Sequence, residues 1–168
     1  MADGIYTVLT RARVPLEEAR RICAGILGLP VLLLGELPPG PPEPGRRFAL
    51  LEVERMPGEF PVRVDCSTEQ EGPEEWAFAA RFAREVRADC LTVEDTAHPF
   101  RYLLAEPGGR VRPVHVDIED TPDGESFGAY RPCTAADPWC APEPFCRTSR
   151  FPAESVLLLG RDDRGRRA

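Results

Sequence analysis

Three cysteines near the end of the chain are the residues whose type and grouping best suit a metal ion. They are Cys133, Cys140 and Cys146, with six residues between the first two and five between the last two. Thiolates are good zinc ligands, but structural zinc sites usually contain cysteine pairs two to four residues apart, and this sequence has none. The fourth ligand would be a distant histidine, His98 or His115, and we predict His98 for this role. Spectator thiols that bind no metal are the alternative.

An acidic run begins at the end of the expected strand of residues 111–118 and continues beyond it. Its carboxylates are Asp117, Glu119, Asp120, Asp123 and Glu125. The run does not fit an EF-hand calcium loop, because placing Gly124 at the sixth position leaves Tyr130 where the bidentate glutamate belongs. We expect a solvated strand end, and its functional interpretation is a surface that attracts a basic partner.

Motifs for catalysis have little support. The segment from Gly124 to Gly128 matches the G-x-S-x-G nucleophile elbow, but no helical pattern follows it, and both histidines precede Ser126. No dinucleotide-binding or Walker motif is present, and the chain has no lysine for a Schiff base or a phosphate site. The sequence therefore favours binding over catalysis and leaves enzymatic activity open.

Composition restricts the class of protein further. The chain has 168 residues with a formal net charge of −7, and 42% of its residues are hydrophobic. These values are typical of a globular domain, and the negative charge disfavours nucleic acid as a partner. No apolar run reaches the roughly 18 residues that span a membrane, and the N-terminus does not resemble a secretory signal. We expect a cytoplasmic protein with reduced cysteines.

Hydrophobic periodicity predicts a helix followed by three strands, and then the same order again. The expected helices begin at Pro15 and Pro73. The expected strands are residues 5–14, 31–34, 47–54, 61–66, 90–94, 100–106 and 111–118. Such elements most simply form an α+β fold, in which a mostly antiparallel sheet carries both helices on one face.

The two halves also resemble each other in sequence. Residues 61–65 and 113–117 are identical at four of five positions, and the apolar residues of the two helices superpose at an offset of 60. We interpret this as an internal duplication within residues 1–120, with repeats of about 5–66 and 61–120. Chance similarity of strand-rich segments is the alternative. Residues 121–168 are expected to form an irregular extension, rich in proline and cysteine, with a final strand at about 155–160.

These features suggest a protein that binds another protein. Small acidic bacterial proteins of this build often act as inhibitors or immunity proteins, and the acidic run suits a basic partner. One alternative is a small zinc protein or enzyme that uses the C-terminal cysteines with a histidine. A second is a scaffold bound through the loop of residues 36–45, where five of ten residues are proline. The uncovered face of the sheet could also form a homodimer.

Overall fold

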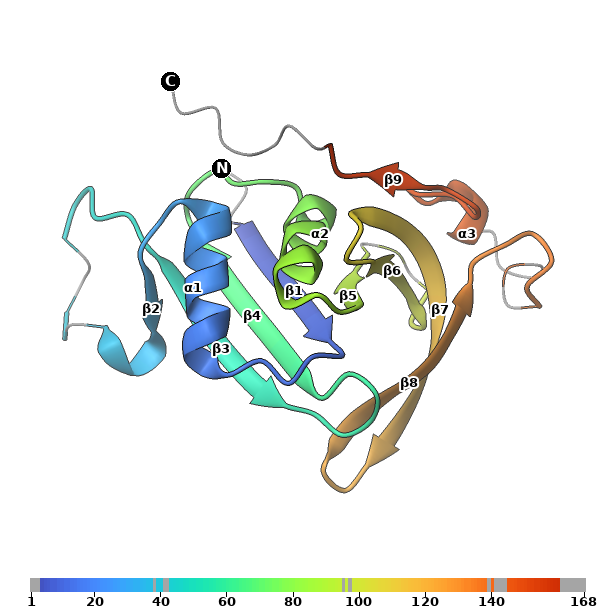
Figure 1. Ribbon diagram of the computed structural model, residues 1–168, viewed down its shortest axis with the longest axis horizontal. Coiled ribbons are helices and arrows are strands. Elements are labelled where there is room, and N and C mark those ends of the chain that lie inside the picture. The colour runs from blue at the N-terminus through green and yellow to red at the C-terminus, as the bar shows by residue number, and fades with distance from the viewer. Residues whose placement is uncertain are drawn as a thin grey trace.

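A mostly antiparallel sheet with helices α1 and α2 against one face forms the main part of the molecule (Figure 1). The computed structural model describes residues 4–37, 39–40, 43–94, 96, 98–138, 140 and 145–160. The strands lie in the order β2-β3-β4-β1-β5-β6-β7-β8, and β9 pairs with β7. The elements are β1 (Gly4–Thr10), α1 (Leu16–Leu27), β2 (Val31–Leu33), η1 (Leu34–Glu36), β3 (Ala49–Arg55), β4 (Val62–Thr68), α2 (Glu75–Val86), β5 (Cys90–Val93), β6 (Arg101–Ala105), β7 (Arg110–Thr121), β8 (Gly124–Pro132), α3 (Phe145–Thr148) and β9 (Leu157–Leu158). The predicted α+β class is confirmed.

Helix α1 begins after a proline and ends at a glycine, as the preferences of these residues predict. Pro15 precedes its first residue, and Glu17 and Glu18 lie near the positive end of the helix dipole. The helix ends at Gly28, whose φ of 66° lies in the left-handed region and whose N–H donates to the carbonyl oxygen of Ala24.

Within the described part of the chain, no helix is both long and apolar enough to cross a membrane.

The main core lies between the helices and the sheet. Alternation along β4 directs Val62, Val64 and Cys66 towards the helices. The ring of Tyr6 on β1 stacks on that of Phe78 on α2, with 4.4 Å between the ring centroids. This core explains why the two helices cover the same face of the sheet.

A second apolar cluster lies on the opposite face of the sheet, where the long hairpin of β7 and β8 bends over it. The cluster contains Leu9, Phe60, Leu91, Leu104, Val114, Val116 and Phe127. The loop between β3 and β4 meets β8 here, because Gly58 bridges to Phe127 and the Glu59 N–H donates to the Phe127 carbonyl oxygen at 2.9 Å. Part of the face without helices is therefore covered by the chain itself.

The region after residue 121 differs from the irregular extension that we expected. Residues 124–132 form the regular strand β8, because they pair with β7 despite a composition that favours turns. A final strand is present as expected, but β9 contains only Leu157 and Leu158. The three cysteines lie between β8 and β9, where the described residues form turns and the short helix α3.

The internal duplication remains a prediction. Both halves contain a helix followed by three strands, as expected. In the first half, however, β2 pairs with β3 in parallel, whereas β5 and β6 in the second half are antiparallel. Strand β1 lies between the two halves and pairs with both.

Replacing Phe82 by alanine should greatly reduce stability. The Phe82 side chain is fully buried in the main core, so the substitution should lower the free energy of unfolding by about 3–5 kcal/mol. Leu34→Ala is the control, because Leu34 is 72% exposed and its loss should cost less than about 0.5 kcal/mol. Urea denaturation measures both values, and equal losses would contradict the assigned core.

Candidate metal centre

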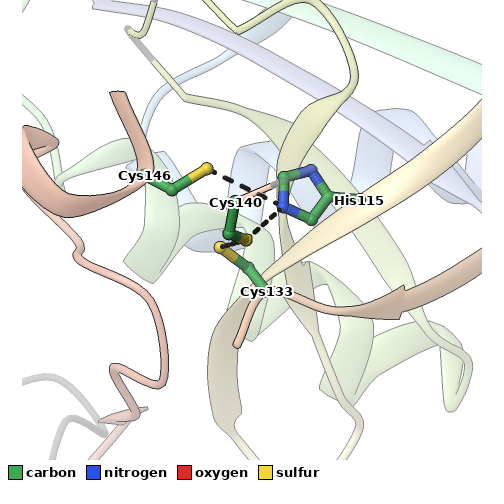
Figure 2. Close-up of side chains that lie close together, drawn as sticks. All are labelled: His115, Cys133, Cys140 and Cys146. Carbon is green, nitrogen blue, oxygen red and sulfur yellow. Dashed lines mark hydrogen bonds between the residues drawn. The ribbon is translucent and has the colours of Figure 1, made fainter. Parts of the chain in front are cut away.

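Four buried side chains converge beside β7: His115, Cys133, Cys140 and Cys146 (Figure 2). Their potential ligand atoms all lie within 4.8 Å of one another. The His115 Nε2 atom is 3.0 Å from Cys140 Sγ and 3.7 Å from Cys146 Sγ. The Sγ atoms of Cys133 and Cys140 are 3.4 Å apart, and all three cysteines are free. One nitrogen and three sulfur atoms thus face a common point.

The cluster lies where β7 changes its pairing partner. Strand β8 pairs with β7 up to Val114 and Pro132, and the Cys133 N–H then donates to the Pro113 carbonyl oxygen at 3.1 Å. Strand β9 takes up the pairing at Arg110 and Val111. His115 lies on β7 beside this exchange, so the sheet fixes its position.

Backbone hydrogen bonds position the other ligands. A turn brings Cys140 inward, because its N–H donates to the carbonyl oxygen of Asp137 at 2.9 Å. Cys146 lies on the single turn of α3. The returning chain then connects to both sides of the cluster, since the Ala153 N–H donates to Cys146 and the Glu154 N–H to Cys133, each at 2.9 Å.

The spacing of these atoms suits a tetrahedral zinc ion. Zinc bonds of about 2.3 Å to sulfur and 2.0–2.1 Å to nitrogen place two ligand sulfur atoms about 3.8 Å apart and a sulfur and a nitrogen about 3.6 Å apart. The separations of 3.0, 3.4 and 3.7 Å run from about 0.6 Å below these values to about 0.1 Å above them, and no pair of ligand atoms is more than 4.8 Å apart. Small side-chain movements would therefore complete the coordination.

The electrostatics suit a cation better than a catalytic thiol. Burial raises the pKa of Cys140 and that of Cys146, while burial lowers the pKa of His115 to about 4. A nucleophilic cysteine needs the opposite, a thiol pKa lowered by its surroundings. A divalent cation would replace the thiol protons and bind the neutral imidazole.

Charged side chains surround the cluster in complementary pairs. Arg101 on β6 is buried opposite His115 in the strand register, and its guanidinium donates to the Glu94 carboxylate and the Phe151 carbonyl oxygen. The Asp137 carboxylate accepts a hydrogen bond from Arg131 Nε at 2.9 Å. These pairs connect the segment around the cluster to the edge of the sheet.

The histidine in the cluster is His115, whereas we predicted His98 as the ligand. His98 lies next to it, with 4.8 Å between the two ring centroids, and its Nδ1 accepts a hydrogen bond from the Phe100 N–H at 3.3 Å. Strand alternation places His115 on the same face as buried Val111, which was the available signal for it. The structure thus gathers the three predicted cysteines around the other histidine.

The acidic run occupies the tip of the hairpin between β7 and β8, at the lower edge of Figure 1. All five carboxylate residues, Asp117, Glu119, Asp120, Asp123 and Glu125, are exposed. Asp117 is 3.3 Å from the Arg131 guanidinium. The run is therefore separate from the cysteines and extends along two paired strands.

The remaining sequence candidates add no site. Residues 124–128 belong to β8, so Ser126 does not occupy a turn between a strand and a helix. Within the proline-rich loop, Pro38, Pro41 and Pro42 lie outside the described residues, and its role as a scaffold contact remains a prediction.

His115 should make the metal-free protein less stable in acid. Its pKa is about 4 when folded and 6.5 when unfolded, so the unfolded chain binds the proton first as the pH falls through this window. The free energy of unfolding should drop by roughly 3 kcal/mol from this residue between pH 6.5 and pH 4. His115→Asn should lack this component in urea denaturation with a chelator present. Identical pH profiles for the two proteins would contradict it.

Comparisons with other proteins do not extend this account. No protein-family model, curated protein or solved structure matches the chain. The function must therefore be inferred from the side chains of this molecule, and the cluster of His115 with three cysteines is its most specific chemical feature.

Proposed function

We propose that this protein binds one zinc ion through His115, Cys133, Cys140 and Cys146, and that the ion holds the C-terminal segment against the sheet. The observation that carries this proposal is the convergence of four buried ligand atoms within 4.8 Å of one another. Three thiolates and one imidazole form an ordinary ligand set for structural zinc. The proposal corresponds to the zinc alternative from the sequence, with His115 in place of His98.

The ligand set favours a structural role over a catalytic one. Catalytic zinc sites keep one coordination position for water or substrate, whereas four protein ligands fill a tetrahedron. All four side chains are also buried, with Cys140 the most exposed at 4%. Among the described residues, this burial leaves little room for a substrate beside the ion.

The C-terminal segment packs on the main core through Phe151, Leu157 and Leu159, but its cysteines lie outside that core. Its local cluster consists of the three cysteines with the partly buried Ala153 packed against them. Strand β9 contributes two residues to the sheet, and α3 contains four. Because little apolar surface is buried around the cysteines themselves, the bonds to zinc would supply much of the energy that orders the part of the segment around them.

The zinc proposal predicts one ion per chain in untagged protein. His115→Asn, Cys133→Ser, Cys140→Ser and Cys146→Ser should each weaken zinc binding by more than about 100-fold, since even losses outside the coordination sphere cost about 10–100-fold. Competition with a chromophoric chelator measures the affinity, and cobalt substitution should give the visible absorption of a tetrahedral thiolate centre. Zinc at 100 times its Kd should also raise the free energy of unfolding by about 2.7 kcal/mol.

Two control variants make this experiment decisive. His98→Asn tests the ligand predicted from sequence and should weaken binding no more than about 10-fold, since His98 contacts the site without joining it. Cys90→Ala removes a buried thiol from the main core and should retain the full zinc content. Protein that contains no zinc, or that loses it only in His98→Asn, would refute the assigned centre.

A second function proposed here is binding of a basic partner protein by the acidic hairpin, as in an inhibitor or immunity protein. What supports it is the exposure of five carboxylates on one β-hairpin, in a chain with a net charge of −7. Such a surface would accelerate encounter with a positively charged protein and would weaken as salt screens the charges.

Neutralising the hairpin should abolish capture of such a partner. The test compares the parent with a variant carrying Glu119→Gln, Asp120→Asn, Asp123→Asn and Glu125→Gln in pull-downs at low and high salt. The matched control removes the same charge from exposed positions elsewhere, through Glu18→Gln, Glu69→Gln, Glu71→Gln and Glu85→Gln. One dominant basic protein lost only from the hairpin variant supports the proposal. Equal retention by both variants, or no retained protein, would overturn it.

A further inference from the structure

We infer that Cys133 and Cys140 form a peroxide-sensitive pair, in which a disulfide between them excludes zinc from the centre. This inference rests on the proposed zinc site and adds its regulation. The two Sγ atoms are 3.4 Å apart, so they must approach by only about 1.4 Å to reach disulfide bonding distance. The sequence separation of seven residues makes closure of the loop between them inexpensive.

The two cysteines are held in different ways. Cys133 is fixed on both sides of its peptide unit, because its N–H donates to Pro113 and its carbonyl oxygen accepts from Glu154. Cys140 lies at the end of a turn, and as a residue it is 4% exposed, against 1% for Cys133 and none for Cys146. We therefore assign Cys140, the less firmly held of the two, as the sulfur that reacts with the oxidant, and Cys133 as the neighbour that resolves the product.

The reaction needs one equivalent of a hydroperoxide, for which hydrogen peroxide is the probe. The Cys140 thiolate attacks one peroxide oxygen, which breaks the O–O bond, forms a sulfenic acid and releases hydroxide. The Cys133 thiolate then attacks the sulfenyl sulfur, which forms the S–S bond and expels a second hydroxide. The two sulfurs lose two electrons, the peroxide gains them, and two protons from solvent convert both hydroxides to water.

The disulfide and the zinc ion compete for the same sulfur atoms. After oxidation, only Cys146 and His115 remain as ligands, and two ligands hold zinc far more weakly than four. The ion leaves without changing its own oxidation state. Cys146 then loses its connection through the ion to Cys133 and Cys140, so α3 is held less firmly, while Phe151, Leu157 and Leu159 still pack on the main core.

Oxidation of the zinc-loaded full chain tests the inference. Hydrogen peroxide is added in the presence of a chromophoric zinc indicator, free thiols are alkylated, and the protein is cleaved after aromatic residues. Cleavage after Trp139 and Phe145 places the three cysteines in separate peptides. We expect one zinc released per disulfide formed, a Cys133–Cys140 linkage, alkylated Cys146, and recovery of zinc binding after reduction.

The controls separate this inference from the zinc proposal. The metal-free protein should form the same linkage more slowly, because burial raises the pKa of the Cys140 thiol and leaves less thiolate when no ion is bound. A chain that binds no zinc would refute the zinc site and leave the thiol pair testable. Cys90→Ala should react as the parent does, whereas Cys146→Ser should still form the disulfide. A linkage between other cysteines, such as Cys23 and Cys66, or zinc retained at peroxide concentrations that oxidise glutathione, would overturn the inference.

Discussion

The pairing of β7 along both of its edges is the interaction on which the rest of the molecule depends. Buried backbone N–H and C=O groups need partners, and β8 supplies them only as far as Val114. The chain must then return, and β9 completes the edge at Arg110 and Val111. The three cysteines lie in the segment that connects β8 to β9. Because both strands pair with the same edge of β7, this segment is held beside His115.

Strand β7 also couples the two cores to this segment. Val111 packs in the main core below the helices, while Val114 and Val116 pack in the cluster on the opposite face. His115 lies between them in sequence, so packing on both faces fixes its backbone. A ligand on such a strand loses little conformational freedom when it binds an ion, whereas the cysteines on the connecting chain must be ordered at a cost.

The sequence predicts what depends on local pattern and misses what depends on pairing. Apolar and polar residues alternate along residues 62–68, which identifies β4. Apolar residues recur at helical spacing in residues 16–27, which identifies α1, because each of these elements buries one face. Strand β8 has glycine, serine and alanine among its residues, and only the pairing with β7 makes it a strand. Strand alternation indicates which face His115 occupies, but the register that places Cys133 beside Pro113, and so brings the cysteines to that face, is not encoded in any spacing of the sequence.

The central position of β1 has a consequence for how the chain folds. This strand precedes the others in the sequence, and its neighbours β4 and β5 are more than 50 residues away, as in the pairing of Gly4 with Thr68. The middle of the sheet thus closes through long loops, which is an entropic cost that slows folding. The two halves of the sheet are joined through β1, which pairs with β4 on one side and with β5 on the other. Neither half can therefore form the middle of the sheet without β1. The molecule should therefore gain its order in one late, cooperative step.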